Sequence, residues 1–159
     1  MKIDVKSLII KLSIIVAVLV LDLVTKAIFD YKNITIIEGV LSFEWQHNTG
    51  AAWSILSEHT WLLTLISSLF IIGFSVFDVY YKNTGVLYSI SYALCFAGAL
   101  GNLIDRIFLG YVRDFIFLDF IKFTTYPTFN VADICLVVGV ILFAICILFS
   151  RKDTKKEEK

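Results

Sequence analysis

Residues 131–149 read VADICLVVGVILFAICILF, an apolar run that is interrupted by a single charged side chain, Asp133. A helix needs roughly 20 apolar residues to cross a bilayer. Three more runs of similar length lie at about residues 8–29, 61–80 and 86–104. The whole chain is 58% hydrophobic with a mean hydropathy of +0.84, whereas an ordinary soluble domain is about half apolar. The sequence therefore predicts a mainly α-helical membrane protein with four transmembrane helices.

The distribution of basic residues predicts the topology of these four helices. The length fits one integral-membrane domain, residues 1–159. Lys and Arg precede the first run, lie in the short link between the second and third, and follow the fourth: Lys2, Lys6, Lys11, Lys82, Arg151, Lys152, Lys155, Lys156 and Lys159. Because basic residues collect on the cytoplasmic side of a membrane, we expect both termini in the cytoplasm. Two segments, at about 30–60 and 105–127, are then extracytoplasmic.

The first extracytoplasmic segment carries a strand pattern. From Leu41 to His47, apolar or aromatic side chains alternate with polar ones, which is the period of a strand. A turn at Glu38-Gly39 separates this stretch from Ile34–Ile37. We therefore expect a small β-sheet on the outer membrane surface. The second extracytoplasmic segment is short and aromatic.

The topology gathers the polar residues of the apolar runs at one depth. Near the outer ends of the first, third and fourth runs lie Asp22, Lys26, Asn102, Asp105, Arg106, Asn130 and Asp133. Ionisable groups in membrane segments are costly and usually functional. The alternative for Asp105 and Arg106 is an ion pair that marks the membrane boundary. Asp78 and Asp119 are expected to be solvated interface residues.

Two carboxylates in a partly dehydrated site suggest acid–base catalysis. They cannot both ionise easily, so one proton is shared between them. The ionised acid can activate a water while the protonated acid polarises a carbonyl, which is how aspartic peptidases work. From spacing alone, Asp105 and Asp114 are both candidates to partner Asp133.

Other chemistries have weaker support in the sequence. Cys95, Cys135 and Cys146 lack the spacing of a disulfide or metal site. The two histidines are isolated, so no metal and no cofactor are expected. The net charge of zero gives no indication of nucleic-acid binding.

Five sequence blocks resemble, in order, those of the bacterial lipoprotein signal peptidases, also called signal peptidase II. They are Asp22-x-x-Thr25-Lys26, Asn48-x-Gly50-Ala51-Ala52-Trp53, Gly98-Ala99-Leu100-Gly101-Asn102-x-x-Asp105-Arg106, Val112-Arg113-Asp114-Phe115-Ile116 and Phe129-Asn130-x-Ala132-Asp133. The resemblance covers nearly the whole chain. One departure is Leu23, where the family commonly has glutamine.

The resemblance implies an aspartic endopeptidase that cuts prolipoproteins just before a diacylglyceryl-modified cysteine. It implies that Asp114 and Asp133 are the catalytic pair. Supporting roles are implied for the other block residues: Asp105 with Arg106 as an ion pair, Asn102 and Asn130 as hydrogen-bond partners of the acids or substrate, Asp22, Lys26 and Asn48 as the lining of the substrate site, Gly50 as a point of close backbone approach, and Ala132 as part of the last block. Two simpler interpretations stay open, a plain turn at residues 48–50 and an exposed pair of Asp22 with Lys26 that reaches the interface.

The same resemblance implies the setting and partners of the protein. We expect a monomer in the bacterial cytoplasmic membrane, with its active site near the extracytoplasmic interface, that meets lipidated prolipoproteins and membrane lipids. A rival hypothesis is a small proton- or cation-coupled carrier, although carriers place binding groups near the midplane. A third is a non-catalytic anchor protein, which would explain the helices but not the five blocks.

Overall fold

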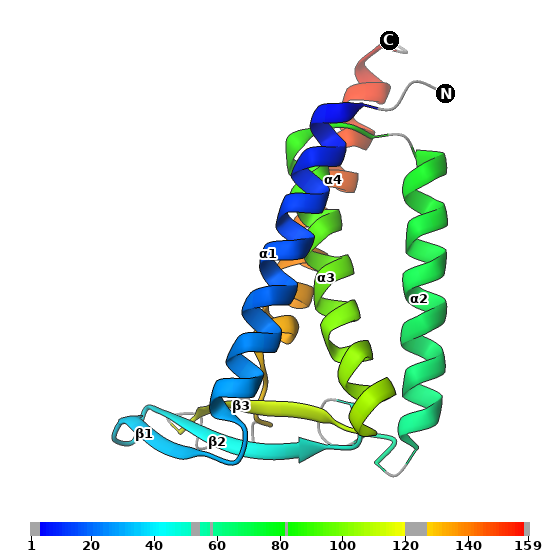
Figure 1. The fold of residues 1–159 in the computed structure, drawn as a ribbon. Helices are drawn as coiled ribbons and strands as arrows, with labels where there is room; N and C mark the ends of the chain where they lie inside the picture. Colours follow the sequence, from blue (N-terminus) through cyan, green and yellow to red (C-terminus); the bar gives the residue numbers. More distant parts are fainter. Residues whose placement is uncertain (1–3, 52–54, 58, 82, 120–126, 158–159) are drawn as a thin grey trace.

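Four long helices and one small sheet make up the fold (Figure 1). The computed structural model describes residues 4–51, 55–57, 59–81, 83–119 and 127–157, with side chains described as far as residue 149. The helices are α1 (Val5–Phe29), α2 (Thr60–Tyr81), α3 (Val86–Leu109) and α4 (Val131–Glu157). Each contains a stretch long and apolar enough to cross a membrane. The prediction of four transmembrane helices is confirmed.

The end of α3 differs from the prediction. We expected the helix to end near residue 104, but it continues to Leu109. It ends where Gly110 adopts a left-handed conformation, with φ of 81°, and donates its N–H to the Arg106 carbonyl. Glycine adopts this conformation without steric cost. Asp105 and Arg106 therefore belong to α3 and not to the segment that follows it.

The sheet has three antiparallel strands in the order β1 (Asn33–Ile37), β2 (Leu41–Asn48) and β3 (Val112–Leu118). The predicted hairpin of β1 and β2 is confirmed, and Gly39 in its turn has a φ of 67°. β3 was not predicted. It pairs with β2 through a register that shifts between Phe43 and Gln46, and Asp114 lies opposite Gln46 directly beside this irregularity. Such bulges re-aim side chains and are frequent next to active sites.

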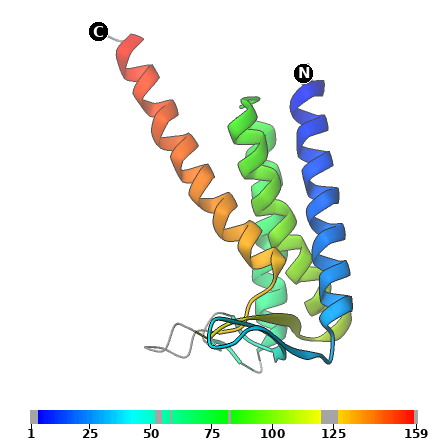
Figure 2. The ribbon, with the colours of Figure 1, turned by 90° about the vertical axis from the view of Figure 1, so that its left-hand side faces the viewer.

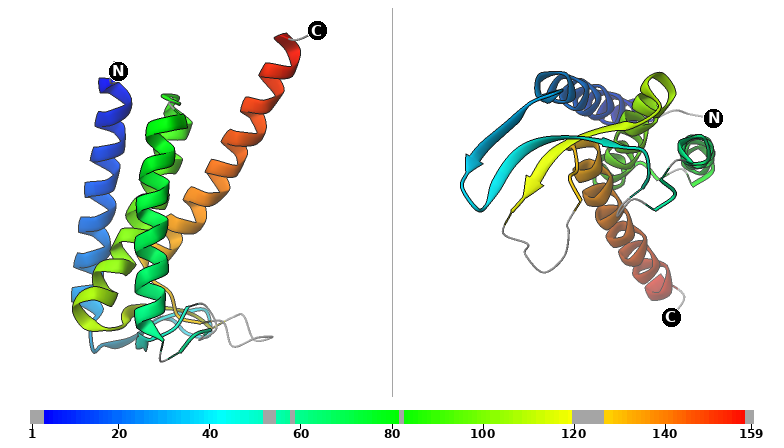
Figure 3. Two further views of the ribbon diagram at one scale, coloured as in Figure 1. Left: turned by 90° about the vertical axis from the view of Figure 1, so that its right-hand side faces the viewer. Right: turned by 90° about the horizontal axis from the view of Figure 1, so that it is seen from below.

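The sheet lies across one end of the helical bundle, and both termini lie at the other end (Figures 1 and 3). Aromatic rings join the two parts, because Phe29 at the end of α1 lies 4.2 Å from Phe43 and 5.0 Å from Phe115 between ring centroids. Helix α4 starts beside the other helices near the sheet and diverges from them toward the C-terminus (Figure 2). The sheet end is therefore where all the elements meet.

Helix α3 is the centre of the bundle, and it meets α4 through glycines. Of its apolar stretch 67% is buried, against 6–11% for the other three helices. A Cβ atom on Gly98 would lie 2.4 Å from the Ala132 carbonyl oxygen, and one on Gly139 would lie 2.6 Å from the Cys95 nitrogen. Small residues let membrane helices approach in this way. Gly98 and Gly139 therefore both permit close contact between α3 and α4.

A methyl group at position 98 should therefore separate α3 from α4. We expect Gly98→Ala to destabilise the protein by about 1–3 kcal/mol, since the added carbon meets backbone that cannot move aside. The matched control is Gly73→Ala on α2, where a Cβ would meet nothing within 4 Å. Equilibrium unfolding in lipid bicelles measures both. Equal stability of the two variants would contradict this account of the helix contact.

Candidate active site

Asp114 and Asp133 reach the same site from two different elements. Asp114 lies on β3 and is 1% exposed. Asp133 lies in the first turn of α4. Backbone hydrogen bonds between Ile116 and Phe129, of 2.8 and 3.1 Å, tie β3 to the chain just before α4. This bridge brings the two acids together, and both line one cavity of about 650 Å³.

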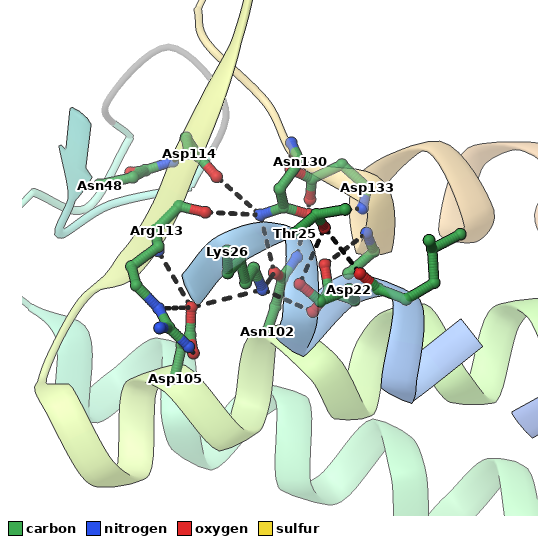
Figure 4. A network of polar contacts seen from close by, with 12 residues as sticks. Asp22, Thr25, Lys26, Asn48, Asn102, Asp105, Arg113, Asp114, Asn130 and Asp133 are labelled. Carbon is green, nitrogen blue, oxygen red and sulfur yellow. Dashed lines mark hydrogen bonds and ion pairs between the residues drawn. The ribbon is translucent and has the colours of Figure 1, made fainter. Parts of the chain in front are cut away.

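Asn130 holds both acids. Its side-chain oxygen accepts from the Asp133 N–H at 2.9 Å, while the Asp133 carboxylate accepts from the Asn130 N–H at 3.1 Å. This reciprocal pair is a capping box, which satisfies the free N–H groups at a helix start. The Asn130 amide also donates to the Asp114 carboxylate at 2.7 Å (Figure 4). One residue thus starts α4 and fixes the geometry of both carboxyl groups.

Two more amides complete the contacts of the acids. Asn102 on α3 donates to the Asp133 carboxylate at 2.7 Å, and Asn48 at the end of β2 donates to that of Asp114 at 2.8 Å. The expected hydrogen bonds of Asn102 and Asn130 to the acids are present. Asn48 also accepts from the Gly50 N–H at 3.0 Å. The turn at residues 48–50 is therefore present, and contact of Asn48 with the substrate stays a prediction.

A buried charge network lies behind the acids (Figure 4). The Lys26 ammonium lies 2.8 Å from Asp22, 3.3 Å from Asp105 and 3.0 Å from the Asn102 side-chain oxygen. Lys26 and Asp22 are 1% and 0% exposed. Asp22 also accepts from the Ala132 N–H at 2.9 Å. The network therefore connects α1 to α3 and to the start of α4.

Three expectations about these residues need correction. We expected Asp22 and Lys26 to line the substrate site, but neither residue lines the described cavity. They also do not extend to the interface, because both side chains are enclosed between helices. In the described part of the chain, Asp105 pairs with Lys26 and Arg113 and not with Arg106. The reason is the turn at Gly110, which brings Arg113 back alongside Asp105, at 2.8 Å between the charged groups.

Arg106 occupies a different position. It lines the cavity together with both acids, and it donates to the Gly50 carbonyl at 3.3 Å. Its Nε atom is buried and has no hydrogen-bond partner among the described residues.

Ala51 also lines the cavity, whereas Ala52 and Trp53 of the same sequence block lie outside the described residues. Sequence reasoning missed Arg113 as a network member, although it precedes Asp114 in the fourth block.

The environment of Asp114 favours its protonated form. Burial, and next the negative charge of Asp133, raise the pKa of Asp114 to about 7, although hydrogen bonds from Asn48 and Asn130 oppose the rise. Asp133 accepts hydrogen bonds from the Asn130 backbone and the Asn102 amide, and it shares one buried site with Asp114, where two carboxyl groups cannot both ionise easily. The arrangement can therefore present one protonated and one ionised carboxyl group near neutral pH.

This assignment predicts the alkaline side of the pH–rate profile. Because Asp114 must keep its proton, cleavage should fall as the pH rises through about 7. Asn48→Ala removes a hydrogen bond that lowers the pKa of Asp114, so the fall should move to higher pH. The control is Asn83→Ala in the link between α2 and α3, which should leave the profile in place. A shift of the Asn48→Ala profile to lower pH would contradict the assignment.

Four helices able to span a bilayer, with two carboxyl groups in one cavity near the bundle end, define a multi-pass membrane protein with a site of the aspartic-peptidase type. Residues 14–149 match the family model described as signal peptidase (SPase) II. The chain belongs to the signal peptidase II family of aspartic peptidases.

Relatives and solved structures agree with this membership. The chain is 41% identical over 128 residues to the lipoprotein signal peptidase of Clostridium acetobutylicum, covering 80% of this chain and 82% of the relative. It is 42% identical over 144 residues to that of Lactiplantibacillus plantarum, covering 86% and 93%. Two structures of bacterial membrane enzymes, determined by the in meso method, match with TM-scores of 0.81 and 0.76 at 33% and 34% identity. The first covers 90% of both chains, and the second covers 87% of this chain and 92% of the other.

Proposed function

We propose that the protein removes the signal peptide from lipidated bacterial prolipoproteins by cutting just before the diacylglyceryl-modified cysteine. The observation that carries this proposal is the cavity in which Asp114 and Asp133 meet apolar side chains of α2 and α4. A peptide bond can approach the acids there while the apolar remainder of the substrate stays in lipid. The relatives named as lipoprotein signal peptidases support the choice of substrate.

The two acids divide the chemistry of the reaction. Ionised Asp133 takes a proton from a water, which attacks the scissile carbonyl carbon, while protonated Asp114 donates its proton to the carbonyl oxygen. The tetrahedral intermediate then collapses as Asp133 gives the proton that it took from the water to the leaving nitrogen, the amine of the lipidated cysteine, while Asp114 takes back a proton from a hydroxyl group of the intermediate, so that both acids return to their starting states. Arg106 and the amides of Asn48 and Asn102 line the same cavity and orient the substrate backbone.

We also propose an orientation and an assembly state. The basic residues precede α1, lie between α2 and α3 and follow α4, which supports cytoplasmic termini. Both termini lie at the end opposite the sheet, so the acids lie near the extracytoplasmic interface. We further propose that the protein is a monomer that folds as one domain over residues 1–159. Membrane lipids surround the apolar outer faces of the helices.

The lipid on the substrate gives a direct test. We expect a prolipoprotein without its diacylglyceryl group to be cut about a hundredfold more slowly or not at all, because the lipid holds the scissile bond at the depth of the acids, and small misplacements are that costly. The measurement compares one precursor with and without the lipid in the same bilayer. Equal rates would mean a signal peptidase without lipoprotein specificity.

A further inference from the structure

A second polar cluster joins α1, α2 and α3 at the end of the bundle that holds the termini. The Lys11 ammonium lies 2.5 Å from the Asp78 carboxylate, and the Tyr88 hydroxyl donates to the same oxygen at 3.0 Å. The ammonium also lies 5.2 Å and 4.9 Å from the ring centroids of Tyr88 and Tyr92. These four residues are called the clamp below. The expectation that Asp78 is solvated is therefore wrong, since its side chain is 20% exposed and paired.

The clamp adds a charged contact to a helix that otherwise meets its neighbours through aromatic rings. Phe74 of α2 lies 4.8 Å from Tyr92 of α3 and 5.3 Å from Phe143 of α4 between ring centroids. Among the described residues of α2, Leu63 alone is buried. Membrane helices are not driven together by the hydrophobic effect, because lipid is as apolar as their side chains. An ion pair with one member on α1 and one on α2 is costly to separate in such surroundings. The clamp therefore fixes the end of α2 that lies farthest from the catalytic acids.

Helix α2 also forms one wall of the cavity that contains Asp114 and Asp133. The catalytic cavity is lined by Ile66 and Phe70 of α2 and by Val137 and Val140 of α4. A second cavity of about 330 Å³ continues from Phe70 along α2. Its lining consists of Leu69, Phe70, Gly73, Phe74 and Phe77 of α2 and Phe143 of α4. Phe77 directly precedes Asp78 of the clamp.

The catalytic cavity and the second cavity together are called the apolar trough below. We propose that the clamp is a positioning cluster that sets the separation of α2 from α4 and so the width of the apolar trough. The trough receives the apolar helix of the substrate's signal peptide, whose far end lies next to the clamp. The inference rests on the proposed function and concerns substrate binding, whereas the chemical step takes place at the other end of the bundle. A loosened α2 weakens the hold on the apolar helix and leaves the acids in place.

The test uses Asp78→Asn and two substrates. One substrate is a lipidated precursor with its whole signal peptide, and the other is a short lipidated peptide that spans the scissile bond but lacks the apolar helix. We expect Asp78→Asn to raise KM for the whole precursor by about 2- to 30-fold at unchanged kcat. The short peptide should be cut as by the wild type. Exchange of the two charges in a Lys11→Asp, Asp78→Lys double variant should restore KM.

The matched control is Ser68→Ala, which removes a polar group of α2 that bonds only to the Thr64 carbonyl of its own helix in the described contacts. It should leave both substrates unaffected. An unchanged KM in Asp78→Asn, or an equal loss with both substrates, would overturn the proposal. If Asp78→Asn does not fold, the Lys11→Met, Asp78→Leu double variant replaces it, because it leaves no charge unpaired.

A distance measurement separates this inference from the proposed function. Spin labels on unnatural amino acids at Tyr80 of α2 and Leu148 of α4, which are 78% and 65% exposed, report the spacing of the two helices. The spacing should change in Asp78→Asn and return in the charge exchange. If the wild type cuts neither substrate, the proposed function fails, and the label distances still decide whether the clamp positions α2. An unchanged distance in Asp78→Asn would overturn the positioning role.

Discussion

Asp114→Asn and Asp133→Asn should each lower the cleavage rate by at least about 10²- to 10⁴-fold, the range for loss of an acid or base in the transition state. Each change removes half of the shared-proton chemistry but keeps the shape of the side chain. Both variants should still insert, fold and bind substrate, because the amides of Asn48, Asn102 and Asn130 remain. The measurement is single-turnover cleavage by purified protein in lipid.

Asp119→Asn is the matched control for the two acid variants. Asp119 follows β3 in the same segment as Asp114, and it is exposed. This change should leave the rate within error of the wild type. Substantial turnover by Asp114→Asn, or loss of activity in Asp119→Asn, would contradict the assignment of the pair.

Lys26→Met should cost about 3–5 kcal/mol of stability, because it leaves buried carboxylates without their cation. Asp22 would keep only its hydrogen bond from the Ala132 N–H, and Asp105 would keep Arg113. The start of α4 depends on Asp22, so activity should fall with stability. Lys32→Met, at an exposed position before β1, is the control and should change neither. Equal unfolding free energies for the two variants would show that the network does not stabilise the fold.

The helices and the hairpin could be predicted because each rests on a local pattern. Apolar runs of the right length predict membrane helices, and the alternation from Leu41 to His47 predicts β2. β3 has no such pattern, because Arg113 and Asp114 are adjacent within it and both serve the site. Its position depends on pairing with β2, which is distant in sequence. A strand defined by its partners cannot be found from its own residues.

Site contacts between distant residues were harder to predict than site membership. Spacing on one helix pointed to Arg106 as the partner of Asp105, since residues four apart share a face. The turn at Gly110 supplies Arg113 instead and leaves Arg106 free to line the cavity. The pair of Lys11 with Asp78 joins two helices, and nothing in either segment alone indicates it. Sequence blocks therefore name the participants, while packing decides which of them touch.

The central claim is that Asp114 and Asp133 together cut a prolipoprotein at its lipidated cysteine. The most direct measurement is mass spectrometry of the products after purified protein meets a diacylglyceryl-modified prolipoprotein in lipid, with a metal chelator present. The account predicts one cut, on the amino side of the modified cysteine, at a rate that the chelator does not change. No cut, a cut elsewhere, or an activity that the chelator removes and zinc restores would contradict it.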